Sequence, residues 1–208
     1  GNEMIRFLEK NYRKMEEIIR VLSISDKWMT KKELARHIGS SESTFIRSNE
    51  EIKQRWGNVL TIKTSHKLGY RLENFNATLY LQILTDMART STATQLLHEF
   101  IQQPGKTIDY YCEAINISRS SFARKLKHCN KVLAAYSLRV IVDRGYQLTS
   151  QDDELSLRIF TTYFFLMYYG HCDLPYYFDK QELKQVMRRN HCILNSISLD
   201  NSYEHDFF

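Results

Sequence analysis

The chain has 208 residues, a net charge of +5, four cysteines, seven glycines and two prolines. This length allows one or two domains with buried cores, and so few glycines leave little for phosphate-cradling loops. The longest apolar run, residues 159–169, is too short to span a bilayer, and the sequence shows no signal peptide. Because the cysteines also lack Cys-x-x-Cys spacing, we expect a reduced, cytoplasmic protein with no membrane partner.

The N-terminal part of the chain is predicted to form two helices and a turn. Apolar residues at three- and four-residue spacing predict a helix over Met4–Leu22 that buries one face against the following elements. Thr30 and Glu33 form a capping box, which predicts the start of a second helix that continues to Ile38. Gly39 then lies in a tight turn, because glycine readily accepts a left-handed backbone.

A third helix and a β-hairpin are predicted to follow this turn. Ser41 is a good N-cap, and Glu42–Trp56 has the helical period, with both signs of charge on its outward face. Two runs, Val59–Thr64 and Gly69–Leu72, then predict an antiparallel hairpin. Helix followed by hairpin is the order of the winged helix-turn-helix, in which the last helix enters the DNA major groove and the hairpin, or wing, holds phosphates.

The next segment is predicted to be a helical linker and support. Leu79–Leu84 and Thr94–Ile101 have helical periodicity, and the polar run Thr90–Thr92 separates them. Gln103-Pro104-Gly105 ends the second of these helices. Thr107 or Asp109 can cap the helix that follows.

A second unit then repeats the pattern of the first. Its helix-turn-helix segment aligns with the earlier one at a constant offset of 77 residues, whereas Asp143–Leu148 aligns with Lys67–Leu72 at an offset of 76. One residue is therefore predicted to be lost between the helix and the wing of the second copy. Asn116 lies in the tight turn of this copy, and asparagine also accepts a left-handed backbone.

The last helix of this second unit is predicted to carry a basic stripe. Ser118 is its N-cap, and Arg124, Lys127, His128 and Lys131 recur at three- and four-residue spacing. No acidic residue lies between Ser118 and Ala135 to neutralise them. Such a stripe suits the phosphates of a nucleic acid.

Positive charge is concentrated in the two predicted units. Lys31–Arg71 contains nine Lys or Arg against four Asp or Glu, and Lys106–Thr149 contains eight against three, so each has a net charge of +5. Residues 151–208 contain five against nine, a net charge of −4. A polyanionic partner for both units is the simplest interpretation, with a solvated basic face as the alternative for either one alone.

The residues predicted to contact double-stranded DNA lie at the helix starts, on the outward helix faces and at the wings. Arg119 and Arg124 are candidates for guanine edges, each contact giving about 1 to 3 kcal/mol of discrimination, and the lysines are candidates for phosphates. The full set is Ser40, Ser43, Thr44, Arg47, Lys63, His66, Lys67, Arg119, Ser120, Ser121, Arg124, Lys125, Lys127, His128, Lys131 and Arg144.

The last part of the chain is predicted to be helical and rich in aromatic residues. Gln151–Asp153 caps a long helix, and Asp179 with Glu182 forms a capping box for another. His171-Cys172 and His191-Cys192 suggest a zinc site, but adjacent residues point apart and structural zinc ligands are usually spaced by two or more residues. We therefore expect no metal and no cofactor.

These patterns resemble the Mga-like transcriptional regulators of Gram-positive bacteria. The resemblance rests on WMTKKELARHIGSSESTFIR with its KLGYRLENFN end, on INISRSSFARKLKHCNKVL with RGYQL, and on the aromatic helix that follows. It implies promoter binding, control of transcription, often activation of virulence or carbohydrate-linked genes, and a homodimer. RNA polymerase is a further candidate partner, and family members usually continue into phosphotransferase-regulation domains.

The sequence thus predicts a mainly α fold with small β-wings, arranged as tandem winged helix-turn-helix domains with a C-terminal helical segment. The expected boundaries are residues 4–74 for the first unit with its N-terminal helix, 75–105 for the linker, 106–150 for the second unit, and 151–208 for a segment that opens a truncated regulatory domain.

Two other functions fit the same pattern. A plasmid replication initiator also pairs two winged helices, and would bind repeated origin sites in place of promoters. A protein-interaction scaffold built from winged helices would require Arg119 and Arg124 to form salt bridges with neighbouring residues. An enzyme is not expected, because the sequence contains no P-loop, HExxH or GxSxG motif and no catalytic set can be named.

Overall fold

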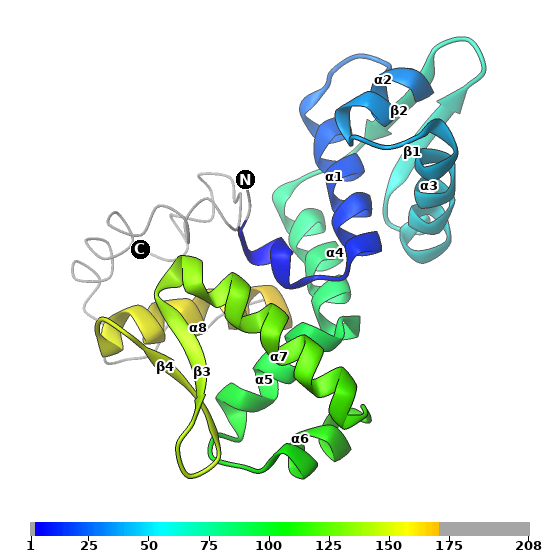
Figure 1. Cartoon of the computed structure of the whole chain (residues 1–208). Helices are drawn as coiled ribbons and strands as arrows, with labels where there is room; N and C mark the ends of the chain where they lie inside the picture. The colour runs from blue at the N-terminus through cyan, green and yellow to red at the C-terminus, as the bar shows by residue number, and fades with distance from the viewer. Residues whose placement is uncertain (1–2, 171–208) are drawn as a thin grey trace. The chain divides into compact units, whose positions relative to one another are not determined.

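The computed structural model of the chain describes residues 3–170 (Figure 1). The chain divides into two compact units. The N-terminal unit is Lys10–Leu84, and the C-terminal unit consists, within the described part, of residues 3–9 and 85–170. The predicted second capping box, the His-Cys pairs and the rest of the C-terminal segment lie outside the described residues.

The N-terminal unit is three helices followed by a two-stranded antiparallel hairpin. Helix α1 packs on α3 and on β2, and α2 packs on α3. Their core includes the fully buried side chains of Ile18, Leu34 and Phe45. The elements are α1 (Lys10–Ile24), α2 (Lys31–His37), α3 (Glu42–Trp56), β1 (Thr61–Ser65), β2 (Gly69–Glu73) and the first part of α4 (Ala77–Thr90).

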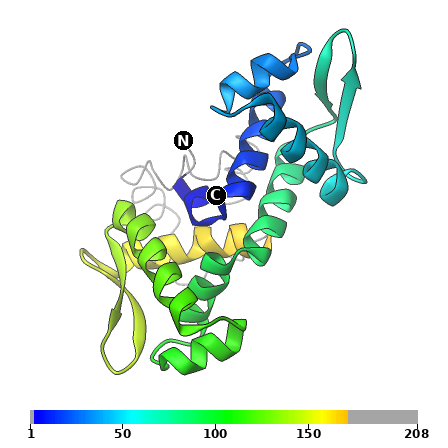
Figure 2. The ribbon, with the colours of Figure 1, turned by 45° about the vertical axis from the view of Figure 1, so that its right-hand side comes forward.

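The C-terminal unit has the same order of three helices and a hairpin, with a short helix before it and a long aromatic helix after it. Figure 2 shows the long helix α8 beside η1, where Phe160 and Phe7 pack edge to face with ring centroids 6.1 Å apart. Its elements are η1 (Glu3–Phe7), the end of α4, α5 (Thr92–Gln102), α6 (Ile108–Ile115), α7 (Arg119–Leu133), η2 (Ala134–Tyr136), β3 (Leu138–Val142), β4 (Tyr146–Ser150) and α8 (Glu154–Tyr169).

The prediction of a mainly α fold with small β-hairpins is confirmed. The N-cap predictions are confirmed as well: the side chains of Thr30, Ser41, Ser118 and Asp153 each accept a hydrogen bond from a backbone N–H three residues further on. Such a contact satisfies one of the free donors of a helix start and stabilises the helix by about 1 kcal/mol. None of the described helices is both long and apolar enough to cross a membrane.

Two predicted boundaries were wrong. The single helix expected over Met4–Leu22 is broken: η1 ends at Phe7 and belongs to the C-terminal unit, whereas α1 begins at Lys10 in the N-terminal unit. Helical spacing could not reveal the break, because the apolar residues on both sides of it are buried. The expected break over residues 90–92 is also shorter, since only the buried Ser91 separates α4 from α5, and its hydroxyl donates to the carbonyl of Met87.

The same contacts fix the hairpin to the rest of each unit. In the N-terminal unit, the N–H of Tyr70 donates to the carbonyl of Met29 at 2.7 Å, and the N–H of Met29 donates back to Tyr70 at 2.9 Å. In the C-terminal unit, the N–H of Tyr146 donates to the carbonyl of Lys106 at 3.0 Å, and the N–H of Gly105 donates to the carbonyl of Tyr146 at 2.8 Å. Each hairpin is thereby joined to the loop that precedes α2 in the N-terminal unit and α6 in the C-terminal unit.

The hairpin registers show where the two copies differ in length. Ile62 pairs with Leu72, and Val140 pairs with Leu148. Val140 is 78 residues after Ile62, whereas Leu148 is 76 residues after Leu72. Relative to the offset of 77, the second copy has therefore gained one residue between helix and wing, where η2 lies, and lost two at the hairpin tip. The predicted loss of one residue between helix and wing was wrong, because sequence alignment records only the sum of the two changes.

A glycine at each hairpin tip is required by close backbone contact. Gly69 and Gly145 have φ values of +103° and +93°, and a Cβ atom at either would lie about 2 Å from the carbonyl oxygen of Met29 or Gly105. Gly39 also has a positive φ, +59°, but has open space around it. The left-handed backbone disfavours any other residue at all three positions, and only the hairpin glycines add a steric clash.

We therefore predict that Gly69→Ala and Gly145→Ala destabilise their units much more than Gly39→Ala. Gly39→Ala should cost about 1 to 2 kcal/mol, the strain of an alanine in the left-handed region. The hairpin variants should cost more than this, because the backbone must also shift. Urea denaturation measures the three free energies of unfolding, and equal losses in the three variants would show that the close contacts are unimportant.

A buried carboxylate joins α1 to α4 within the N-terminal unit. Glu16 is 2% exposed, its Oε1 accepts hydrogen bonds from the Tyr80 hydroxyl at 2.9 Å and from Arg20 Nε at 3.1 Å, and its Oε2 has no partner in the described structure. Burial raises the pKa of this carboxyl, and Arg20 and Tyr80 oppose that rise. Desolvation is the larger effect, since the charged form loses more hydration than two partners restore.

This raised pKa predicts a pH dependence of stability. Just above the unfolded pKa of 4.5, the folded unit retains a proton that the unfolded chain has released, so the free energy of unfolding falls as pH rises through the folded pKa. Glu16→Gln cannot titrate and should lose this part of the pH dependence, whereas Glu50→Gln, an exposed control on α3, should keep it. Parallel curves of stability against pH for wild type and Glu16→Gln would contradict the prediction.

Candidate nucleic-acid interface

Helix α7 begins at a turn that the local sequence determines. The α6 helix ends at Asn116, whose φ of 54° is in the left-handed region, as predicted for this turn. The N–H of Ile117 then donates to the carbonyl of Cys112 at 2.9 Å, and Ser118 caps α7. Helices α6 and α7 therefore form a helix-turn-helix in which the first residues of α7 are exposed.

The outward face of α7 is basic. Phe122, Cys129 and Val132 are buried, which turns the opposite side of the helix to solvent. Burial also raises the pKa of the Cys129 thiol to about 12, so this cysteine is an inert core residue. The exposed face, called the α7 face below, consists of Ser120, Ala123, Arg124, Lys127 and Lys131.

The three cations of the α7 face are available to a ligand. Arg124, Lys127 and Lys131 form no ion pair with any described residue. They lie at three- and four-residue spacing, so their charges sit on one side of the helix. Lys125 is half-buried beside this face, and Ser121 is half-buried with its N–H donating to the Ser118 hydroxyl.

The equivalent face of α3 has a different chemistry. It consists of Ser43, Ile46, Arg47, Glu50 and Gln54, each 77 residues before its counterpart on the α7 face. Glu50 lies 4.0 Å from Lys53, and Arg47 forms no ion pair within the described structure. The α3 face is thus polar and nearly neutral, as the mixed charge in the sequence predicted.

Two serine and threonine residues near the start of α3 have local roles. Thr44 is half-buried; its N–H donates to the Ser41 hydroxyl, and its own hydroxyl accepts from Ser41 at 2.9 Å. Ser40 is half-buried in the turn, where its N–H donates to the carbonyl of Ala35. These contacts complete the helix start, so Ser43 is the more accessible hydroxyl.

Three predicted contact residues are engaged within the protein. Arg119 donates to Asp109 from Nη2 at 2.7 Å and from Nε at 3.0 Å, and this hydrogen bond raises the pKa of the exposed Arg119. Lys63 forms a 3.2 Å ion pair with Glu73 across the first hairpin. His128 is half-buried and donates from Nε2 to the carbonyl of Arg6 at 2.7 Å, so its ring attaches η1 to α7 and lies away from the α7 face.

The hairpin tips carry the remaining predicted residues. His66 and Lys67 are exposed at the first tip, where the Ser65 hydroxyl accepts from the N–H of Lys67 at 3.3 Å. Arg144 is exposed at the second tip, with a φ of 52°. Its counterpart at the first tip, by the offset of 76, is Leu68. Both tips thus present cations, but from different positions.

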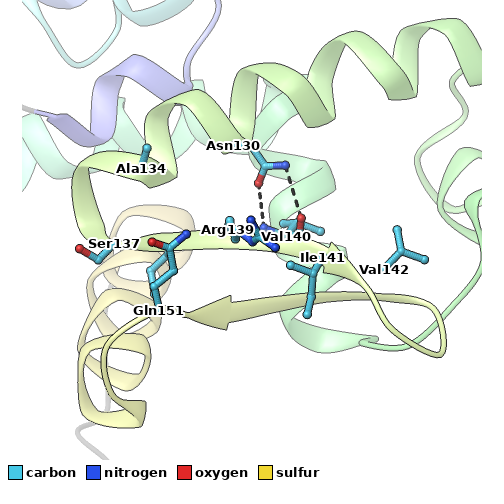
Figure 3. A pocket seen from close by; sticks show the side chains of 9 residues that line it. Asn130, Ala134, Ser137, Arg139, Val140, Ile141, Val142 and Gln151 are labelled. Carbon is cyan, nitrogen blue, oxygen red and sulfur yellow. Dashed lines mark hydrogen bonds between the residues drawn. The ribbon is translucent and has the colours of Figure 1, made fainter.

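A groove of about 500 Å³ in the C-terminal unit is lined mainly by β3, together with Asn130 of α7, Ala134, Ser137 and Gln151 (Figure 3). Asn130 crosses from α7 to β3: its Oδ1 accepts from the N–H of Val140 at 2.7 Å, and its Nδ2 donates to the carbonyl of the same residue at 3.4 Å. This double contact fixes the wing to α7. Arg139 is exposed on β3 and lines the groove. Sequence analysis could have found Arg139 as an exposed cation, because apolar and polar residues alternate along the start of this strand.

The fold and this surface define a class of protein. A helix-turn-helix, a hairpin wing and an exposed basic face on the second helix are the features of helix-turn-helix DNA-binding domains. Residues 76–169 match the family model described as the Mga helix-turn-helix domain. This match covers 94 of the 208 residues and confirms, for this part of the chain, the resemblance to the Mga-like family seen in the sequence. No curated protein matches the chain.

The Arg119–Asp109 pair generates a prediction about binding strength. Asp109→Asn should free Arg119, so DNA affinity should rise. The slope of log affinity against log salt should also become more negative by about one, the amount expected for one additional phosphate contact. Glu113→Gln makes the same charge change on α6 at an exposed residue that does not pair with Arg119. Affinities measured across a salt series distinguish the two variants, and an equal gain in both would mean that net charge alone is responsible.

Proposed function

We propose that the chain is a sequence-specific regulator of transcription that binds promoter DNA through two winged helix-turn-helix units. The observation that carries the proposal is the α7 face, where three cations lie without ion pairs on the second helix of a Mga helix-turn-helix domain. Because these cations form no ion pair with any described residue, they can replace the counterions that surround the phosphates of DNA. The repeated hairpin contacts support a second unit of the same kind around α2 and α3.

The residues of the α7 face have different proposed roles. Arg124 lies in the first half of the helix, the part that contacts base edges in helix-turn-helix complexes, and a guanidinium can pair with the two acceptors of a guanine. Lys127 and Lys131 lie further along and bind phosphates, as does Lys125 at the side of the face. Ser120 and Ser121 at the helix start are hydrogen-bond donors for a phosphate.

The N-terminal unit is proposed to depend more on its wing. The α3 face offers Arg47 and Ser43 to the DNA, and its other charged residue is acidic, so it contributes little net attraction. His66 and Lys67 at the hairpin tip supply the phosphate contacts, and Lys63 contributes less because Glu73 already neutralises it. Arg144 has the same role at the second tip.

The wider role follows from the family resemblance. We propose that the chain acts in the cytoplasm as a homodimeric activator with RNA polymerase as a further partner. The proposed domain boundaries are 10–74, 75–105, 106–150 and 151–208, and the first domain begins at Lys10 because residues 3–9 belong to the C-terminal compact unit. The protein-interaction scaffold is less well supported, because it requires both arginines to be paired: Arg119 is paired with Asp109, but Arg124 is not paired with any described residue.

Fluorescence anisotropy across a salt series tests DNA binding by the α7 face. The wild-type chain should bind a labelled duplex taken from upstream of its own gene, with affinity that falls steeply as salt rises. Lys127→Ala combined with Lys131→Ala should reduce the slope by about two contacts on every duplex, whereas Lys27→Ala, at an exposed loop position, should not. No binding of the wild type at low salt would refute the proposed function.

Arg124→Ala tests base recognition separately. The substitution should weaken binding to the preferred duplex by about 1 to 3 kcal/mol and reduce the preference over a scrambled duplex. Arg124→Lys keeps the charge but loses the paired geometry, so it should restore the salt slope without restoring the preference. Unchanged preference in both variants would remove Arg124 from base recognition.

A further inference from the structure

One residue on the α3 face does not fit a phosphate-binding role. Ile46 is 41% exposed on a helix whose other outward residues are polar. Neither α3 nor α7 exposes another large apolar side chain. Its counterpart on α7 is Ala123, so the two faces differ at this position in apolar volume as well as in charge.

The fold gives no reason for an isoleucine at this position. An exposed β-branched residue favours a helix less than alanine does, and a partly exposed side chain contributes little to the core. On the opposite side of α3, Phe45, Ile52 and Trp56 are all buried in the core of the unit. Ile46 is therefore available for a contact outside the unit.

The neighbours of Ile46 indicate the nature of that contact. Ser43 and Glu50 lie one turn away on either side, and Arg47 is adjacent, so the isoleucine is surrounded by hydrogen-bonding groups that suit base edges. Lys53, two turns further along the same stripe, donates to the Thr64 hydroxyl of β1 at 3.2 Å. Ile46 thus lies on the hairpin side of the α3 face, in the first half of the helix.

We propose that Ile46 is a specificity-determining residue that packs against the C5-methyl group of a thymine in the major groove. The proposal rests on the proposed DNA-binding function of the N-terminal unit. The thymine methyl is the one large apolar group on base edges in that groove, and apolar side chains recognise it by contact. Burying one methyl group in this way corresponds to about a fourfold difference in affinity.

The α3 and α7 faces would then recognise different sequences. Arg124 of the α7 face favours guanine, whereas Ile46 of the α3 face favours thymine, and Ala123 is too short to make an equally extensive methyl contact. The DNA site is expected to contain two unlike segments as a consequence. An inverted or direct repeat of one segment alone would not satisfy both faces.

Replacing thymine by deoxyuridine removes only the methyl group and so tests the contact directly. A duplex selected from a random pool by the wild-type chain is prepared with each thymine replaced singly by deoxyuridine, and affinities are measured by anisotropy. At one position the wild type should lose about fourfold, and Ile46→Ala should lose nothing there while keeping its response at every other position. Ile46→Val should retain part of the effect, and Ile24→Ala, at a residue that is 81% exposed at the end of α1, should behave as wild type.

The outcomes separate this proposal from the function on which it rests. Selective, salt-dependent binding with the same deoxyuridine response in wild type and Ile46→Ala would overturn the role of Ile46 and leave DNA binding intact. A change in self-association of Ile46→Ala, with no change in its deoxyuridine response, would assign the residue to a protein contact and also overturn the proposal. Failure of the wild type to bind or select any duplex would overturn both.

Discussion

The edge-to-face contact between a helix phenylalanine and a hairpin tyrosine positions the candidate DNA-binding surface in each unit. Phe45 and Tyr70 have ring centroids 5.0 Å apart at 80°, and Phe122 and Tyr146 have centroids 5.1 Å apart at 76°. The backbone of the same tyrosine pairs with the loop before the helix-turn-helix. A pair of this kind contributes about 0.5 to 1.5 kcal/mol beyond its buried area, and here it also sets the angle between helix and wing.

Further aromatic packing strengthens this junction in the C-terminal unit. Tyr111 lies edge to face against Phe100 and Tyr146, and its hydroxyl donates to the carbonyl of Gln103 at 2.6 Å while accepting from the N–H of Lys106 at 3.2 Å. Asn130 adds a polar contact from α7 to β3. Helix α7 and the hairpin are therefore joined by both aromatic and polar contacts, which support the placement of the α7 face beside the wing.

The sequence predicted the parts of this arrangement that depend on local chemistry. The caps at Ser41 and Ser118 and the left-handed turn at Asn116 each follow from residue type, and the outward cations follow from helical spacing. Pairs distant in sequence could not be predicted in this way. His128 contacts Arg6 across 122 residues, and no periodicity in α7 distinguishes that histidine from the lysines beside it.

Paired charges set the limit on predicting the site. Arg119 and Asp109 lie ten residues apart on different helices, and only the geometry of the turn between them shows that one neutralises the other. Ile46 was not among the predicted contact residues, because an isoleucine on a helix is ordinarily assigned to the core. Helical periodicity predicts which residues lie on the surface, but whether such a residue is free to contact a ligand depends on its neighbours in space.

Methylation interference is the most direct measurement of major-groove binding by α7. The guanines of a free duplex that the wild-type chain recognises are first methylated at N7, and the chain is then added. N7 is the acceptor that Arg124 is proposed to contact in the major groove. Binding through α7 predicts that methylation of at least one guanine abolishes complex formation, and that Arg124→Ala no longer responds to methylation at that guanine. Undiminished binding to duplexes methylated at every guanine in turn would contradict recognition of guanine in the major groove.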